Sequence, residues 1–376
     1  MGGVLREEKV AICEQCPLYR APMVMSEGPP DAKIMFVGEA PSWEEVRTGR
    51  PFYGRAGQYL NGLLDETEPK IDRDEVYIAN ALKCQIPIDM KKQGKDIDQA
   101  IACCRQRLNV EIRRVAPKLL VALGDVALRS TVGKSGITKA RGELHEPIDL
   151  LPTAPKVLPT FHPAYLLRGN EGYRGVVVRD LERAYRVATG GRATPRHPVV
   201  YRICQTFGEA LVFLDELDRQ KVIAFDSETS AFRTKLQRIV GTALDYQRAN
   251  IQCMSFSWKE YEAWVLPRYG FKRVEVWTAH QWEVIRSRLK RKFEDPKTIW
   301  VIQNAPFDLR FLSRIDIDVY KINFRDLLVM MNLIDENSFK DLETLAFLFT
   351  DLGNYKTRMA KKLSKLRKQK KRKEAA

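Results

Sequence analysis

Cysteine is the first residue type in this sequence whose placement suggests chemistry. Of seven cysteines, five lie within the first 104 residues. Cys13 and Cys16 form a C-x₂-C pair, a spacing at which two thiolates can bind one metal ion or cluster. Cys84 follows an apolar run, and Cys104 shares the apolar face of a helix predicted over residues 96–115. An all-thiolate site suits zinc or an iron–sulfur cluster, and the spacing alone leaves both open.

A second group of residues follows apolar runs that read as buried strands. A loop rich in glycine and proline, residues 38–57, comes directly after the run 33–37. Two later runs end in an amide and an imidazole. The resulting candidates are Gly38, Glu39, Ala40, Glu45, Phe52, Asn80 and His162. Because open α/β sheets place ligands beyond the carboxyl ends of their strands, this combination predicts a pocket for a small, flat, polar ligand.

Carboxylates form a third group further along the chain. Asp226 and Glu228 end a predicted strand, where side-chain alternation puts both on one face. Asp308 lies in the segment 304–308, which opens a helix just after another predicted strand. Three carboxylates gathered at strand ends could hold two Mg²⁺ or Mn²⁺ ions for phosphodiester hydrolysis.

The elements that must position these groups fall into two stretches of alternating strand and helix. In the first stretch, short apolar runs separated by amphipathic helices predict a mainly parallel sheet covered on both faces. The second stretch predicts another α/β unit with a mixed sheet. A Gly- and Pro-containing segment at 191–198 is typical of a linker. The predicted division is a domain over 1–190, the linker 191–198, a domain over 199–352 and a basic tail over 353–376.

Charge and hydropathy narrow the class of protein. The net charge is +15, but residues 356–376 carry eleven Lys or Arg and one acid, so the rest of the chain is only mildly basic. The tail could hold phosphates non-specifically or could be a solvated terminus. The residues near Met1 contain no apolar run of the kind that a secretory signal needs. No apolar run in the sequence is long enough to span a membrane. We therefore expect a cytoplasmic protein in a reducing, intracellular compartment.

Residues 1–190 closely resemble the family 4 uracil-DNA glycosylases, which carry an iron–sulfur cluster. The matching segments run in the family's order across the whole stretch: Gly38–Pro41, Gly49–Gly54, Asn80–Cys84, Ala102–Arg105, Leu123–Asp125 and His162–Arg168. The resemblance implies a three-layer α/β/α fold with a parallel sheet. It also favours a [4Fe–4S] cluster over zinc, with Cys13, Cys16, Cys84 and Cys104 as its ligands.

The same resemblance implies roles in excising a flipped uracil by hydrolysis of its N-glycosidic bond, the first step of base excision repair. Phe52 would stack on the uracil ring, and Asn80 would read the base edge. His162 would donate a hydrogen bond near O2, where negative charge builds up as the bond breaks. Glu39 and Glu45 are candidates to place water or to stabilise the sugar cation. Gly38, Ala40, Leu167 and Arg168 would also bind the substrate, with the segment 166–168 as a wedge in the minor groove.

The second stretch resembles the DnaQ-like 3′–5′ exonucleases, in the form found in family A DNA polymerases. The resemblance rests on Asp226-Ser-Glu228, on the segment 304–308 and on the flanking segment 341–346, and it implies an RNase H-like fold. The family's third motif, Tyr-x₃-Asp or His-x₄-Asp, is missing after Asp308. Either this is the amino-terminal part of a larger replication or repair polymerase, or the domain binds DNA without cleaving it.

The function expected from the sequence is therefore uracil-DNA glycosylase activity on single- or double-stranded DNA, joined to an exonuclease-like domain. A polymerase or replisome component is the expected protein partner. Two alternatives remain open at this stage. The first domain could be a non-catalytic module that senses uracil and docks or stalls a polymerase, or it could be a zinc-stabilised scaffold.

Overall fold

The computed structural model describes residues 13–87, 94–149, 154–191, 199–230, 232–233, 239–240, 249–270 and 274–350. Residues 192–198 of the predicted linker and the whole predicted tail, 353–376, lie outside these ranges. The chain divides into two compact units. The first comprises Met1–Pro195 together with Asn337–Ala376, and the second comprises Arg196–Glu336.

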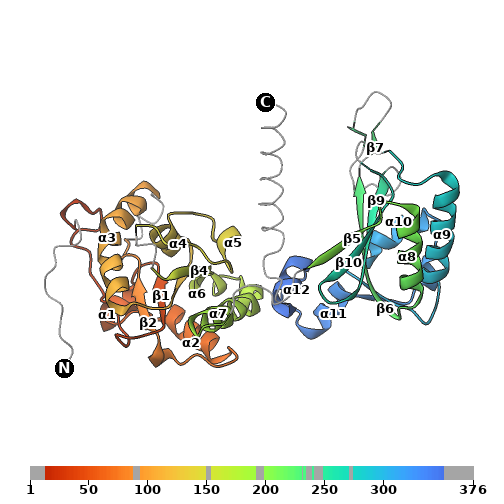
Figure 1. The fold of residues 1–376 in the computed structure, drawn as a ribbon. Coiled ribbons are helices and arrows are strands. Elements are labelled where there is room, and N and C mark those ends of the chain that lie inside the picture. The colour runs from red at the N-terminus through yellow and green to blue at the C-terminus, as the bar shows by residue number, and fades with distance from the viewer. Residues whose placement is uncertain are drawn as a thin grey trace, which may run out of the picture. The chain divides into compact units, whose positions relative to one another are not determined.

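The first unit is built on a parallel sheet of four strands in the order β2-β1-β3-β4 (Figure 1). These strands are β1 (Ile34–Gly38), β2 (Tyr77–Asn80), β3 (Leu119–Leu123) and β4 (Lys156–Thr160). Almost every residue in them is buried, as expected for a parallel sheet with helices on both faces. In the register of β1 with β2, Gly38 pairs with Asn80, so both lie at the carboxyl edge of the sheet.

Helices cover both faces of this sheet, because alternate strand residues point to opposite sides. Met35 and Val37 belong to one core, with residues of α3 and α4. Ile34 and Phe36 belong to the other, with residues of α2 and α7. The helices of the unit are α1 (Trp43–Thr48), α2 (Arg55–Asp65), α3 (Gly94–Val115), α4 (Asp125–Val132), α5 (Ile137–Ala140), α6 (Pro163–Leu166), α7 (Arg174–Ala188) and α12 (Leu342–Phe349).

The placement of α12 differs from the predicted domain division. The sequence analysis assigns residues up to 352 to the second domain, whereas the chain from Asn337 onward packs with the first unit. Phe347 of α12 is buried in the same apolar core as Phe36 and Leu60. A helix pattern at 342–349 is local and visible in sequence, but the core that it joins is set by long-range packing.

The second unit contains a mixed sheet in the order β12-β11-β6-β9-β10-β5. Strand β9 is antiparallel to both of its neighbours, and the other pairs are parallel. The strands are β5 (Val200–Ile203), β6 (Val222–Ser230), β9 (Asn250–Lys259), β10 (Glu262–Pro267), β11 (Ile299–Ile302) and β12 (Phe324–Asp326). A separate pair, β7 (Phe232–Arg233) and β8 (Ile239–Val240), completes the described strands.

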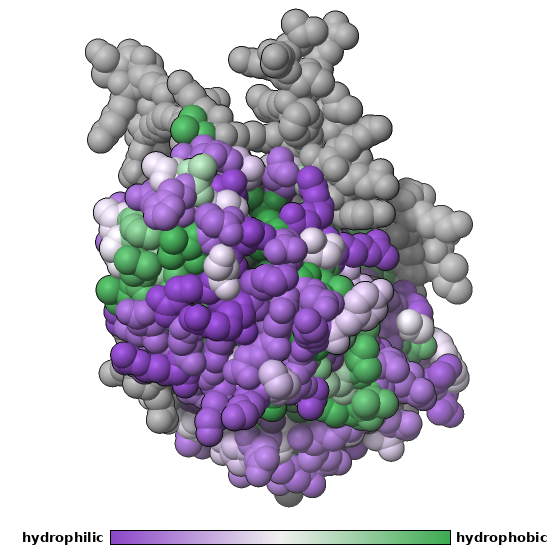
Figure 2. All heavy atoms as spheres, turned by 90° about the vertical axis from the view of Figure 1, so that its right-hand side faces the viewer, coloured by the Kyte–Doolittle hydropathy of each residue, from purple (hydrophilic) through white to green (hydrophobic). Residues whose placement is uncertain are grey.

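The helices of the second unit are α8 (Phe207–Asp218), α9 (Ala279–Phe293), α10 (Ala305–Ser313) and α11 (Leu327–Ile334). Its core is strongly aromatic, with Phe293 stacked on Trp300 at a centroid distance of 3.9 Å. Hydrophilic side chains cover most of the face shown in Figure 2 and leave smaller apolar patches.

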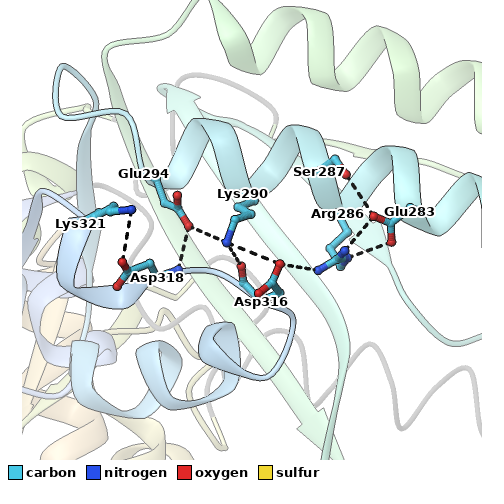
Figure 3. A network of polar contacts seen from close by, with 8 residues as sticks. All are labelled: Glu283, Arg286, Ser287, Lys290, Glu294, Asp316, Asp318 and Lys321. Carbon is cyan, nitrogen blue, oxygen red and sulfur yellow. Dashed lines mark hydrogen bonds and ion pairs between the residues drawn. The ribbon is translucent and has the colours of Figure 1, made fainter.

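A network of polar contacts fixes α9 against the segment that follows α10 (Figure 3). Arg286 Nη1 donates to Asp316 Oδ2 at 2.9 Å, and the backbone N–H of Asp318 donates to Glu294 Oε1 at 2.8 Å. Asp316 is 64% exposed, so its ion pair with Arg286 contributes little to stability. The effect of these contacts is to hold the loop after α10 in register with α9.

The predicted fold class is confirmed in both halves: an α/β unit with a parallel sheet, followed by an α/β unit with a mixed sheet. The described helices include none that is long and apolar enough to cross a membrane.

Candidate active site

A cavity of about 670 Å³ opens beside the carboxyl edge of the first sheet. The loop after β1, the start of α2 and the loop after β4 all contribute to its wall. Of the sequence-predicted site residues, those that line it are Glu39, Ala40, Glu45, Phe52, His162, Leu167 and Arg168. The chain segments that contribute these residues are far apart in sequence and meet because parallel strands end at one edge of the sheet.

Gly38 brings Phe52 and Asn80 together. A Cβ atom at Gly38 would lie 2.4 Å from Asn80 Oδ1 and 2.4 Å from Phe52 Cε2, so only glycine fits between them. Asn80 is 3% exposed, and its Nδ2 has no hydrogen-bond partner in the described part of the chain. An unpaired buried amide is costly, which makes this N–H₂ group a donor that a bound ligand can satisfy.

The backbone holds Phe52 in an unusual conformation. Its φ of +54° is in the left-handed region, which is unfavourable for a residue with a Cβ. Gly57 accommodates it, because a Cβ there would lie 1.6 Å from the carbonyl oxygen of Phe52. The ring is 6% exposed and its centroid lies 5.6 Å from that of His162.

His162 begins α6 as its N-cap and is followed by Pro163. Its Nδ1 accepts a hydrogen bond from the backbone N–H of Ala164 at 3.1 Å. An accepting Nδ1 assigns the proton of the neutral ring to Nε2, which then donates. Burial, and secondarily the charge of Arg168, lowers the pKa of His162 to about 4. The imidazole is therefore neutral at pH 7.

Glu45 is predicted to place water or to stabilise the sugar cation, but in the structure its carboxylate binds backbone amides. One oxygen accepts from the backbone N–H of Phe52, and the other accepts from the N–H of Ser42 at 2.7 Å. The second contact belongs to a capping box at the start of α1. With both oxygens engaged by backbone amides, Glu45 holds the strained Phe52 turn, while Glu39 lies on the cavity wall.

Sequence reasoning gave no site role to one residue that packs against His162 and to one that lines the cavity. Gly124, with φ of +87°, starts the turn into α4, and a Cβ there would lie 3.1 Å from the Cβ of His162. Arg129 lines the cavity and forms ion pairs with Asp98 and Asp125. The pattern Leu123–Asp125 was a signal for Gly124, but nothing in the sequence marks Arg129.

The predicted cluster ligands lie in one neighbourhood of the first unit. Burial, and then nearby Cys104, Cys16 and Cys13, raises the pKa of Cys84 to about 11. Burial likewise raises the pKa of Cys16, with contributions from Cys103 and Cys13. These mutual effects show that the thiols are close enough to interact. Cys103, which the sequence analysis did not include, is buried beside them.

Within the described residues, no group of three or more His, Cys, Asp or Glu side chains is arranged to hold a metal ion. The chemistry of the donor set nevertheless fits a sulfur-liganded group. As thiolates in one partly buried place, these groups would repel one another, and a bound cation or cluster would offset that repulsion.

In the second unit, β6 and α10 place the three predicted carboxylates. Asp226 and Glu228 alternate with buried Ser227 along β6, so both are on the strand's exposed face. Asp308 is 2% exposed, and its Oδ1 accepts from the backbone N–H of Ser227 at 3.0 Å and from the Ser227 hydroxyl. Burial, followed by the charges of Asp308 and Glu228, raises the pKa of Asp226 to about 6.

Asp326 is a further residue that sequence reasoning missed in this unit. Its Oδ1 accepts from the backbone N–H of Asn304 and its Oδ2 from that of Ala305, each at 2.9 Å. Asn304 has φ of +55°, so this bidentate contact holds a strained turn at the start of α10. The sequence signal that could have identified Asp326 is an acidic residue between a short strand and the apolar run of α11.

Comparison with known proteins identifies the family of the first unit. Residues 25–182 match the model of the uracil DNA glycosylase superfamily. A type-4 uracil-DNA glycosylase of Thermotoga maritima is 43% identical over 182 residues, which are 47% of this chain and 90% of that protein. One from Sulfurisphaera tokodaii is 33% identical over 48% of this chain and 83% of that protein. The chain thus belongs to the uracil DNA glycosylase superfamily. Within it, the chain is a member of the type-4 uracil-DNA glycosylases.

Residues 201–376 match a 3′–5′ exonuclease family model. A DNA polymerase of Bacillus phage SP01 is 26% identical over 88% of this chain, which spans 36% of that polymerase. The solved structure of Escherichia coli RNase D is 13% identical, with a TM-score of 0.28 over 39% of this chain and 32% of that one. The resemblance to an exonuclease unit is confirmed, and the mixed sheet with antiparallel β9 has the layout expected of an RNase H-like fold.

Replacing Gly38 by alanine should disrupt the close approach of Phe52 and Asn80. The added Cβ must displace one of them, and we expect a loss of about 1–3 kcal/mol in unfolding free energy from overpacking. Gly62 is the matched control, because it lies in α2 and a Cβ added there would have nothing within 4 Å. Gly62→Ala should stabilise the chain by about 0.5–1 kcal/mol. Urea unfolding measures both, and equal effects would contradict the close approach.

Proposed function

We propose that the first unit excises uracil from DNA by hydrolysing its N-glycosidic bond. The observation that carries this proposal is that the Phe52 ring and the His162 imidazole line one cavity, with the Asn80 amide next to the Phe52 ring across Gly38, in a chain of the type-4 family. A base within a duplex must leave the stack to reach such a cavity, so the substrate is a flipped or unpaired nucleotide.

The Asn80 amide supports selection of uracil over cytosine. Its oxygen can accept from N3–H of uracil while its unpaired Nδ2 donates to O4. Cytosine presents an acceptor at N3 and a donor at position 4, which would leave buried polar groups unpaired. The Phe52 ring would hold the flipped base by stacking.

The neutral His162 supports stabilisation of the leaving group. Its Nε2–H can donate to O2 of uracil, where negative charge accumulates as the glycosidic bond breaks. A neutral donor does not need to give up its proton to perform this role. Glu39 lies on the cavity wall and is a candidate to place water, whereas the Glu45 carboxylate binds the backbone amides of Ser42 and Phe52.

The exposed rim of the cavity fits a role in holding the DNA. Leu167 is 38% exposed and Arg168 is exposed beside it, immediately after α6. An apolar side chain at such a rim can occupy the gap that a flipped base leaves, while an arginine binds phosphate. Gly38 and Ala40 would contribute backbone contacts to the base.

We propose a [4Fe–4S] cluster on Cys13, Cys16, Cys84 and Cys104. The all-sulfur donor set and the mutual effects among these thiols support it. When bound, such a cluster would cross-link the chain segments at 13–16, 84 and 104. No step of the excision chemistry transfers electrons, so its role would be structural.

For the second unit we propose binding of Mg²⁺ or Mn²⁺ at Asp226, Glu228 and Asp308, next to the 3′ end of a DNA strand. The shared face of β6 and the buried Asp308 support this site. The similarity to a phage polymerase makes a DNA polymerase the proposed partner. We also propose that the protein works in a reducing intracellular compartment, because cysteine ligands stay reduced there and DNA is present there.

A non-catalytic uracil sensor is the alternative for the first unit. It would need the pocket but not a leaving-group donor. The neutral, correctly protonated His162 beside Phe52 favours the enzyme over the sensor.

Full-length protein should release uracil from a single-stranded oligonucleotide carrying one uracil, leaving an alkali-labile site. His162→Ala should lower the single-turnover rate by about 100- to 1,000-fold, because one oxyanion donor is lost. His145→Ala is the matched control, since that imidazole contacts the backbone oxygen of Ala140 outside the cavity. Intact strands at enzyme excess would contradict the proposal.

The rate of excision should be independent of His162 ionisation between pH 5 and pH 8. Because burial lowers its pKa to about 4, the donating neutral form predominates throughout that range and is lost only as the pH falls through 4. The same shift means that stability from this group declines as the pH falls from about 6.5 towards 4. A rate that fell tenfold per unit above pH 6.5 would show that the imidazolium is the active form.

Calorimetric titration with Mn²⁺ tests the second site. Full-length protein should bind Mn²⁺, and Asp226→Asn combined with Asp308→Asn should weaken that binding by at least about tenfold through loss of two charged ligands. Asp316→Asn is the control, because that carboxylate pairs with Arg286 on the surface of the same unit. Equal affinity in the double variant and the control would exclude the site.

A further inference from the structure

The segment 337–349, here called the return segment, leaves the second unit and packs on the first. It joins the first unit by direct contacts. Arg179 Nε donates to the backbone oxygen of Leu348 at 2.8 Å, and Phe347 is 6% exposed. Phe347 belongs to the same apolar core as Phe52 and Phe161.

Glycines in the first unit leave room for this segment. A Cβ at Gly172 would lie 2.5 Å from the backbone oxygen of Asn337 and 3.0 Å from the Phe339 ring. A Cβ at Gly142 would lie 3.2 Å from the Phe347 ring. At these two glycines the backbone of the first unit therefore approaches the return segment too closely for a larger side chain to fit without displacement.

Two chains of contact lead from the return segment to the loop that carries His162. In the first, the Phe339 ring centroid lies 4.3 Å from that of Tyr173, and Tyr173 lies 4.6 Å from Phe161. Phe161 directly precedes His162 and also stacks on Tyr165 of α6 at 5.2 Å. This row of aromatic rings packs against the turn that positions His162.

The second chain runs through a buried ion pair. The Arg141 guanidinium lies 4.2 Å from the centroid of Phe347 and 5.7 Å from that of Phe161. It also pairs at 3.0 Å with Asp180, which is fully buried and accepts from the Thr160 hydroxyl at 2.6 Å. Thr160 ends β4, two residues before His162. Phe347 thus covers the cation that pairs with Asp180, the carboxylate that ties α7 to the end of this strand.

We propose that the return segment braces the His162 loop, with Phe339 and Phe347 as positioning residues for uracil excision. The brace makes the first unit depend on chain that follows the second unit in the sequence. The kinetic part of this inference rests on the proposed function, whereas the docking part does not.

A cut between the units tests the docking. A protease site inserted in the full chain within 192–198 separates residues 1–191 from 199–376 covalently, and the return segment remains with the second piece. The two pieces should co-elute in size-exclusion chromatography. Phe339→Ala combined with Phe347→Ala should release them, whereas Phe349→Ala should not, because Phe349 is 61% exposed on the same helix. Separation without any substitution, or association in the double variant, would overturn the docking.

Single-turnover excision by uncut protein tests the positioning. Phe339→Ala should lower the maximal rate about tenfold with little change in the concentration of half-maximal rate, because a small misplacement of a reacting group is costly in rate but not in binding. Phe339→Tyr should restore the rate, and Phe349→Ala should keep it. An unchanged rate in Phe339→Ala and Phe347→Ala would overturn the brace, whereas absence of excision in the unsubstituted protein would defeat the proposed function instead.

Discussion

One close approach governs the first unit: strand β1 ends at a residue with no side chain, and the ring of Phe52 and the amide of Asn80 meet across it. The glycine at position 38 is required because a single added carbon would overlap both groups. The left-handed Phe52, the cap formed by Glu45 and the glycine at position 57 all serve to hold that ring in place. The pocket is therefore a property of backbone geometry as much as of side-chain chemistry.

Two polar groups at this site, the Asn80 amide and the His162 imidazole, add electrostatic features to this geometry. The cavity is lined by a histidine whose surroundings keep it neutral, and next to the Phe52 ring lies the Asn80 amide donor, which has no partner among the described residues. Both features are unfavourable for the empty protein and become favourable when a planar base with matching donors and acceptors is present. Such costs in the folded state are typical of a binding or catalytic site.

Much of this could be predicted from sequence, because it depends on local patterns. Short apolar runs predicted the four parallel strands, and their ends predicted where Asn80 and His162 would meet Phe52. The contact of the Glu45 carboxylate with the backbone N–H of Phe52 could not be predicted, because nothing in the sequence marks that amide as its partner. The unit to which α12 belongs was also beyond reach, since Phe347 joins a core formed by residues far away in the chain.

The most direct test of the account exchanges the amide that is meant to read the base. Rates of excision of uracil and of cytosine should be compared in otherwise identical oligonucleotides for the unsubstituted protein and for Asn80→Asp. The account predicts strong preference for uracil in the unsubstituted protein, and a preference reduced by about 100-fold or more in Asn80→Asp, because a buried hydrogen-bonding mismatch is reversed. An unchanged preference for uracil in Asn80→Asp would show that residue 80 does not face the base.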